Sequence, residues 1–238
     1  MVKLKKIIEC VMNPKFFKYY LKGVSPLFEL TPLIKSINQV NTLIDIGSNK
    51  GQFSSIMKSF FPNISIHSFE PQKDELEIQK KLLGNINIDY YEFALGSEEK
   101  TMEFNITKRK DSSSLLSPLL TNNNSYLNKK KINVTVKKLD NVLDINSLKK
   151  PIIIKLDVQG FELRTLMGSI SFLEEVDYII SEVSFIDVYQ DQVSSSELIR
   201  FLEAKNFTIE NKTNLSILNG KKFQEDILFV KKKNYQIK

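Results

Sequence analysis

The sequence of 238 residues has only one cysteine, Cys10, and only one histidine, His67. One cysteine cannot form an internal disulfide, and the two residues together are too few for a Cys/His zinc site. These absences exclude a domain held together by its own disulfides and a zinc protein of that kind. A metal ion bound by this chain alone would need oxygen ligands, the type that Mg²⁺ prefers.

Arginine is scarce as well, because only Arg109, Arg164 and Arg200 are arginine among the 34 basic residues. Proteins read DNA bases largely with the forked guanidinium group of arginine. The net charge of +6 is therefore mainly a lysine charge, and we expect no nucleic-acid partner. The lysines at 128–131 and 231–233 would suit an anionic glycan or a lipid-linked acceptor, or they simply keep the surface soluble.

Long hydrophobic runs are also absent. No apolar stretch approaches the ~20 residues of a membrane-spanning helix. The first ten residues, MVKLKKIIEC, lack the sustained apolar region and the cleavage site of a secretory signal. We therefore expect a cytoplasmic protein. With 42% hydrophobic residues, the chain can bury the core of one good-sized domain.

Residues 1–38 form a basic stretch that we predict to be a helical N-terminal arm. Within 3–23, six lysines stand against one glutamate, among Ile, Phe and Tyr. A basic helix of this kind is typical of a segment that lies on a membrane surface, and it could also close as a lid over a substrate. A helix packed on the core would expose the same lysines to water. The sequence leaves peripheral membrane contact, a lid and core packing open.

Residues 39–238 alternate between short apolar runs and helical patterns. Strands are expected at 42–46, 64–70, 87–95, 151–158 and 176–185, and helices at 52–61, 72–83, 161–172 and 195–205. This alternation is typical of βαβ units on a parallel sheet. The sequence therefore predicts one α/β domain over 39–238.

Two further apolar runs, at 207–213 and 225–232, have no helical pattern between them. We expect them to pair in antiparallel fashion and to close the sheet, with a turn at Asn219 and Gly220. Between the two halves of the domain, residues 108–131 are polar and rich in turn formers. They favour a long loop over the carboxyl edge of the sheet, where loops carry function.

The stretch LIDIGSNKGQF, at 43–53, joins the first expected strand to the first helix. Gly47 and Gly51 would let the backbone approach a ligand at this turn, but their G-x-x-x-G spacing is not the dinucleotide fingerprint. Asp45 at the tip of the strand would repel a pyrophosphate, whereas it could accept hydrogen bonds from an amine. The turn therefore predicts an amine-bearing ligand rather than a phosphate.

Glu70 ends the second expected strand, in the stretch SFEP. An acidic residue at this place takes the ribose hydroxyls in dinucleotide-binding folds. A ribose next to an amino group points to S-adenosylmethionine as the cofactor. Either acidic residue by itself could also be no more than a turn former or a helix cap.

Five stretches together resemble the successive motifs of the FkbM-type methyltransferases: IDIGSNKGQF, FEP, ALG, IKLDVQGFE and SEVSF. The resemblance covers about 42–231 and leaves the basic arm out. It implies a Rossmann-like class I methyltransferase fold, with a seven-stranded, mostly parallel sheet and a reversed last hairpin. It also implies use of S-adenosylmethionine for O-methylation, often of sugars in glycans or of hydroxyls on secreted metabolites.

The resemblance further implies roles for individual residues. The methionine part of the cofactor would lie against Asp45, Gly47, Asn49 and Gly51, the ribose against Glu70, and the adenine near Phe93 and Ala94. Lys50 also stands inside the cradle, and we assign it no role from the sequence.

The chemistry is expected at IKLDVQGFE, where strand alternation puts Lys155 and Asp157 on one face, beside the first strand. Asp157 could take the proton of the acceptor hydroxyl. Lys155 lies in an apolar run and needs a carboxylate partner, either Asp157 or Glu182, or else a lowered pKa that would make it a base. Glu162 is expected in the first helical turn, as a catalytic candidate or as a residue favoured there by the helix dipole.

Several points stay open at this stage. An all-oxygen Mg²⁺ site could form between Asp157 and Glu182. The serines of DSSSLLSP, at 111–118, could fold over the ligands or form a plain turn, and SFIDVYQDQ, at 184–192, could be a sugar-binding wall or core. The acceptor could be a glycan sugar or a small hydroxylated metabolite, and a nicotinamide-dependent oxidoreductase is the alternative from another class.

Overall fold

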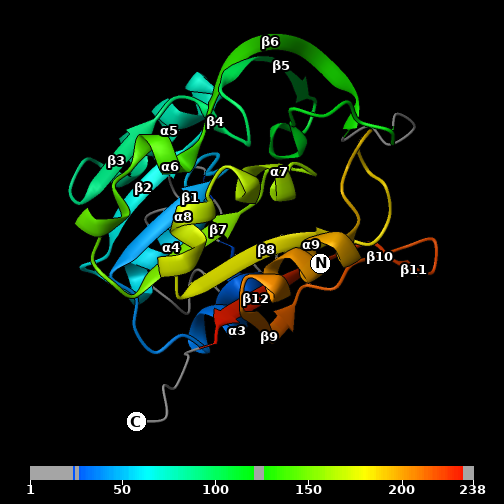
Figure 1. Ribbon diagram of the computed structural model, residues 1–238. Coiled ribbons are helices and arrows are strands. Elements are labelled where there is room, and N and C mark those ends of the chain that lie inside the picture. Colours follow the sequence, from blue (N-terminus) through cyan, green and yellow to red (C-terminus); the bar gives the residue numbers. More distant parts are fainter. Residues whose placement is uncertain (1–23, 25–26, 121–125, 233–238) are drawn as a thin grey trace.

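The computed structural model describes residue 24, residues 27–120 and residues 126–232. A large sheet has helices on both faces, and a smaller sheet stands beside it (Figure 1). The basic segment 3–23, for which we predict a helix, lies outside the described residues. Among the helices of the described part, none is long and apolar enough to cross a bilayer.

The large sheet confirms the predicted architecture of seven mostly parallel strands. Its order is β3-β2-β1-β7-β8-β12-β9, and β12 alone runs opposite to the other six strands. The strands span Thr42–Ile46 (β1), Ser65–Phe69 (β2), Ile88–Tyr91 (β3), Ile152–Leu156 (β7), Tyr178–Ser184 (β8), Phe207–Thr213 (β9) and Gln224–Lys231 (β12). The strand order reverses between β1 and β7, and ligands bind at the carboxyl edge of such a switch point.

Helices cover both faces because neighbouring residues of a strand point to opposite sides. Leu43 packs against the α4 side of the sheet, whereas Ile44 packs against the α8 side. One layer contains α4 (Gln52–Phe60) and α5 (Lys73–Leu83), and the other contains α6 (Leu139–Val142), α7 (Glu162–Met167), α8 (Ile170–Glu175) and α9 (Ser195–Ala204). Every residue of β1 and of β7 is buried, which explains their unbroken apolar runs.

The last part of the predicted arm packs on the sheet. It forms a short 3₁₀ helix, η1 (Phe28–Leu30), and α3 (Thr31–Lys35). Leu33 and Ile34 are fully buried in the core on the α4 side, and Asn211 of β9 donates from Nδ2 to Ser36 Oγ at 2.9 Å. The boundary at residue 38 stays a prediction, but residues 28–37 contribute to the core of the sheet.

The antiparallel closure of the sheet is confirmed. β12 pairs with β9, and the segment between them contains a small hairpin of β10 (Ile217–Leu218) and β11 (Lys221–Lys222). Its turn lies at Asn219 and Gly220, both of which have a positive φ. The turn chemistry that the sequence suggested is therefore used, although it closes a local hairpin rather than joining β9 to β12 directly.

The region after β3 differs from the prediction. The single strand expected at 87–95 is wrong, because β3 ends at Tyr91 and β4 (Ala94–Leu95) joins a second sheet of order β4-β6-β5. The sequence did not predict β5 (Lys100–Thr107), and β6 (Asn128–Lys137) takes up the end of the loop expected over 108–131. In NKKKINVTVK the polar start made the strand hard to predict, although its later residues alternate and place Val134 and Val136 in a small core.

The helix expected at 161–172 is divided into α7 and α8 at Gly168 and Ser169. The reason is close packing against the segment after β4. A Cβ atom added at Gly168 would lie 1.9 Å from the backbone oxygen of Gly96. No side chain fits there, so the chain passes Gly96 with a glycine and starts a new helix.

We expect Gly168→Ala to lower the free energy of unfolding by about 3 kcal/mol, since the backbone must move to relieve the contact. Gly220→Ala, in the hairpin turn, is the matched control, because a Cβ there meets nothing within 4 Å and the positive φ of +77° opposes it. That control should cost about 1 kcal/mol. Urea denaturation measures both, and equal losses would contradict the packing argument.

Candidate active site

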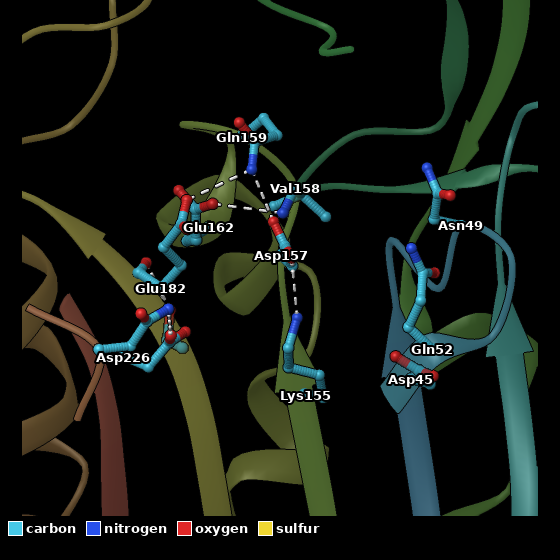
Figure 2. Close-up of polar contacts among 12 residues, drawn as sticks. Asp45, Asn49, Gln52, Lys155, Asp157, Val158, Gln159, Glu162, Glu182 and Asp226 are labelled. Atoms are coloured by element: carbon cyan, nitrogen blue, oxygen red, sulfur yellow. Dashed lines mark hydrogen bonds and ion pairs between the residues drawn. The ribbon is translucent and has the colours of Figure 1, made fainter. Parts of the chain in front are cut away.

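Charged side chains gather on one face of adjacent strands, in or next to β1, β7, β8 and β12. They are Asp45, Lys155, Asp157, Glu182 and Asp226 (Figure 2). Asp45 is the register partner of Lys155, and Glu182 is the register partner of Asp226. All five lie on the strand face that packs against α4 further down the sheet. Strand alternation thus collects one cation and four carboxylates above an apolar layer.

These side chains line a cavity at the carboxyl edge of the sheet. Its walls come from the ends of β1, β2, β7 and β8, the start of β12, residues 27–30, and residues 109–115 with Tyr126, which follow β5 and precede β6. The residues predicted for the site that line it are Asp45, Gly47, Asn49, Glu70, Phe93, Ala94, Lys155, Asp157 and Glu182. Gly51 and Glu162 are not part of its wall.

The turn after β1 needs its glycines for contacts within the protein. Gly47 has φ +76°, and a Cβ there would lie 2.0 Å from the backbone oxygen of Asp157. Gly51 has φ +79°, and a Cβ there would lie 2.6 Å from Cγ of Gln79 in α5. Gly47 thus brings the turn close to β7 at the cavity, while Gly51 packs against a helix. Lys50 forms an ion pair with Glu75 at 3.7 Å.

Glu70 holds two neighbouring segments of backbone. Its Oε2 accepts from the N–H of Asn49 and its Oε1 accepts from the N–H of Gln72, both at 2.8 Å. Burial raises the pKa of Glu70 to about 7, although these hydrogen bonds favour the charged form. Each oxygen keeps a second lone pair for a ligand in the cavity.

Asp45 is buried next to the turn, with 1% of its surface exposed. Its Oδ2 accepts from Ser54 Oγ at 2.6 Å, whereas its Oδ1 has no partner among the described residues. Burial raises the pKa of Asp45, and the nearby charge of Lys155 opposes this shift. A buried carboxylate oxygen without a donor is costly, and a donor supplied by a ligand would remove that cost.

Aromatic rings lie at the end of the cavity wall that β2 and the segment after β3 form. Phe93 meets Phe69 edge to face at 5.7 Å between ring centroids, and the Lys137 ammonium lies 4.7 Å from the Phe93 centroid. Ala94 is buried beside it. The segment expected near the adenine therefore offers a flat apolar surface.

Lys155 forms the predicted ion pair with Asp157. Its ammonium lies 3.1 Å from Asp157 Oδ2, and its side chain is 3% exposed. Burial works against the charge, but the carboxylates of Asp157, Asp45 and Asp226 outweigh it, so that the pKa of Lys155 is raised. The ion pair and the raised pKa therefore favour Lys155 as a buried cation in the middle of the cavity.

Glu182 and Asp226 face each other across β8 and β12. Desolvation and the nearby charges of Asp157 and Asp226 hold the pKa of Glu182 well above its usual range. Burial raises the pKa of Asp226 to about 6. Amide groups support both: Gln224 Nε2 donates to Glu182 Oε2 at 2.7 Å, and Asn214 Nδ2 donates to Asp226 Oδ2 at 3.0 Å. This half of the cavity thus carries two neighbouring buried carboxyl groups whose pKa values are both raised.

Glu162 is the first residue of α7, where we predicted it. Its Oε1 accepts from the N–H of Gly160 at 3.1 Å and of Val158 at 3.3 Å, so it ties down the turn between β7 and α7. Burial raises the pKa of Glu162 to about 7. Its contacts are with the backbone of the turn, which favours a structural role over the catalytic one.

Sequence reasoning missed several polar residues that line the cavity: Gln52, Gln159, Asn214, Gln224 and Asp226. Gln159 stands inside the motif KLDVQGFE and could have been noticed there. Asp226 interrupts the apolar run of β12 on the same face as Leu228, and this is the signal that could have identified it. Gln52 stands inside the motif IDIGSNKGQF, at the start of α4, and could have been noticed as well. Gln224 starts β12 and Asn214 follows β9, so their places at the cavity depend on how the last strands pair.

Two stretches left open now have positions. Ser112 and Ser113 of DSSSLLSP line the cavity, and Lys110 in the same segment forms an ion pair with Glu75 of α5, so this loop folds over the cavity. In SFIDVYQDQ, Tyr189 is buried in a small core and Gln190 is exposed. The core interpretation therefore holds for Tyr189, and neither residue lines the cavity.

The magnesium site between Asp157 and Glu182 gains no support. In the described part of the chain, no three His, Cys, Asp or Glu side chains are grouped so that they could hold a metal ion. The amide nitrogen of Gln159 donates to both carboxylates, and it lies where a shared cation would have to bind.

A seven-stranded sheet of this order, with acidic residues at the carboxyl ends of β1 and β2, has the Rossmann-like fold of the class I methyltransferases. The comparison with known families is specific. Residues 45–209 match the family described as the methyltransferase FkbM domain, and the chain belongs to this family. No curated protein matches the sequence.

Solved structures share the fold at low sequence identity. An uncharacterized protein from Listeria monocytogenes is 11% identical with a TM-score of 0.50, covering 86% of this chain and 67% of that one. Magnesium protoporphyrin IX methyltransferase from Synechocystis, solved with bound SAM, is 9% identical with a TM-score of 0.47, covering 85% and 76%. Precorrin-6y C5,15-methyltransferase from Geobacter metallireducens is 11% identical with a TM-score of 0.46, covering 85% and 86%. Such likeness concerns the fold alone.

The buried carboxyl of Glu162 should make stability depend on pH. Its folded-state pKa, about 7, lies above the ordinary 4.5, so its contribution is fully present below about pH 4.5 and is lost as the pH rises through 7. We expect Glu162→Gln, which keeps an acceptor oxygen without the charge, to be more stable than the parent at pH 8 by as much as about 3 kcal/mol. The advantage should shrink toward pH 5. Melting temperatures across this range measure it, and a constant difference would contradict the assignment.

Proposed function

We propose that the protein transfers the methyl group of S-adenosylmethionine to a hydroxyl oxygen of a sugar, in a glycan or a glycosylated carrier. One observation carries this proposal: the cavity has two chemically different halves. Asp45, with its unpartnered oxygen, lies on one side with Asn49 and Gln52, whereas Asp157, Glu182 and Asp226 lie on the other (Figure 2). A cofactor and an acceptor would meet above Lys155.

The first half fits the polar groups of the cofactor. Asp45 Oδ1 is buried and lacks a donor, and the cofactor's amino group would supply one. Glu70 has lone pairs left for the ribose hydroxyls, and Phe93 with Ala94 offers a surface for the adenine. Asn49 and Gly47 would complete the cradle around the methionine part. Gly51 would act indirectly, by holding α4 and α5 in place.

Bound S-adenosylmethionine supplies an electrophilic methyl group on a sulfonium. The protein must align the acceptor hydroxyl with it, take up the proton and keep water away. Both oxygens of Asp157 are engaged, one by Lys155 and one by Gln159. Glu182 has a raised pKa, and from the described residues it accepts hydrogen bonds at Oε2 only. Glu182, with Oε1 left for the acceptor, would therefore take up the proton, and Asp157 would orient the hydroxyl.

The acceptor half suits a molecule rich in hydroxyls, because its wall alternates carboxylates with the amides of Gln159, Asn214 and Gln224. A small hydroxylated metabolite would find the same partners and is the second candidate. Nicotinamide-dependent oxidation gains no support, since the chain belongs to a methyltransferase family. The proposal assigns no step to a metal ion.

The cofactor assignment predicts that the protein binds S-adenosylmethionine and its demethylated product with micromolar or better affinity, and NAD far more weakly. At pH 8, where Glu70 is mostly ionised, Glu70→Ala should weaken binding by about 1–3 kcal/mol, because charge-assisted hydrogen bonds to the ribose are lost. Glu70→Gln keeps an acceptor oxygen, so its affinity for S-adenosylmethionine should lie between those of the parent and Glu70→Ala. Calorimetry measures all three proteins. Unchanged affinity in Glu70→Ala would mean that Glu70 only stabilises the backbone of Asn49 and Gln72 and does not bind the cofactor.

The catalytic assignment predicts an order of effects. With a methyl acceptor found by isotope tracing in cell extracts, Glu182→Gln should lower kcat by about 10²- to 10⁴-fold through loss of the proton acceptor. Asp157→Asn should lower kcat less, and it should also lower the melting temperature because Lys155 loses its buried partner. If Asp157→Asn were the more damaging to kcat at equal folding, Asp157 would be the proton acceptor instead.

A further inference from the structure

Gln159 has a backbone conformation that residues with a side chain rarely adopt. Its φ is +55°, and Gly160 follows with φ +95°. A strained residue of this kind costs about 1–3 kcal/mol and persists only where its surroundings enforce it. Here the hydroxyl of Ser114 donates to the carbonyl of Gln159 at 2.7 Å. The loop over the cavity therefore holds Gln159 by its backbone.

The amide of Gln159 lies between two carboxylates (Figure 2). Its Nε2 donates to Asp157 Oδ1 at 2.7 Å and to Glu182 Oε2 at 3.3 Å. An amide nitrogen carries two hydrogens, so one group can serve both acceptors at once. The opposite amide orientation would point oxygen at two carboxylates, and the partners therefore fix which way the amide lies.

Tyr189 holds the other end of the amide. Its hydroxyl lies 2.8 Å from Gln159 Oε1 and 2.8 Å from the carbonyl of Ser112. Its ring packs edge to face on Tyr126, at 5.9 Å between centroids, in a small buried core. A phenol carries one hydrogen, so Tyr189 donates to Gln159 Oε1 or shares that hydrogen with the Ser112 carbonyl. Its buried ring keeps the hydroxyl beside the Gln159 side chain.

We propose that Gln159 is a positioning residue, whose amide holds Asp157 and Glu182 at a fixed separation and offsets the repulsion between their charges, while Tyr189 and Ser114 hold Gln159. The inference rests on the proposed function in taking Glu182 as the proton acceptor. Its geometric part, the support of Glu182 by the amide, holds for any acceptor and can be measured without one.

A role in packing alone would be met by an apolar side chain of the same length. Gln159→Met removes the two N–H donors and keeps the length, and Tyr189→Phe removes only the hydroxyl that holds the amide. Gln39→Met is the matched control, since Gln39 is exposed at the amino end of β1. Glu182→Gln identifies the Glu182 signal by its disappearance.

The measurement is an NMR titration of the protein labelled with ¹³C at the side-chain carboxyl groups. Donors to a carboxylate stabilise its charged form, so Gln159→Met should move the titration midpoint of Glu182 upward by about one pH unit. Tyr189→Phe should shift it in the same direction by less, and Gln39→Met should leave it in place. Melting temperatures of the same samples report folding.

An unchanged Glu182 midpoint in folded Gln159→Met would overturn the proposal, and so would an equal shift in Gln39→Met. If Gln159→Met does not fold, Tyr189→Phe decides the matter, and a midpoint equal to that of the parent overturns the proposal. Calorimetry with S-adenosylhomocysteine on the parent tests the cofactor half separately. Failure of that binding would count against the proposed function and leave the titration result intact.

Discussion

The site depends on one constraint, a lysine ammonium buried in the central strand β7. A charge removed from water costs several kcal/mol unless carboxylates surround it. Lys155 meets this requirement with Asp157 on its own chain segment and Asp45 on β1. The need to surround one cation therefore brings together the ends of β1 and β7. It also explains why the turn after β1 must pass so close to the Asp157 backbone that only glycine fits at position 47.

The second sheet covers the cavity at the carboxyl edge of the large sheet. β5 and β6 stand above the carboxyl ends of the large sheet (Figure 1), and the segment that follows β5 is attached to both halves of the cavity. Lys110 contacts Glu75 on the α5 side, and Ser114 contacts Gln159 on the β7 side. The enclosure of the cavity thus comes from an insertion between β4 and α6, outside the alternating strands and helices.

The sequence predicted those parts whose pattern is local. The alternation of strands and helices, the shared face of Lys155 and Asp157, and the position of Glu162 follow from periods of two and 3.6 residues. The second sheet was not predicted, because four residues of β6, Asn128 to Lys131, are strongly polar and their pattern favours a loop. Asp226 was missed because its proximity to Glu182 depends on the pairing of strands far apart in the chain.

The position of β12 has a consequence for the order in which the molecule is completed. β12 is inserted between β8 and β9, although it follows both in the chain. Domains are synthesised from the N-terminus, and unpaired strand edges expose a nascent chain to aggregation. Until residue 231 has left the ribosome, β8 has a bare edge, β9 has no neighbour, and Glu182 faces no Asp226. The half of the cavity around β1 and β2 contains no residue of β12, so only the half with Glu182 and Asp226 waits for the last strand.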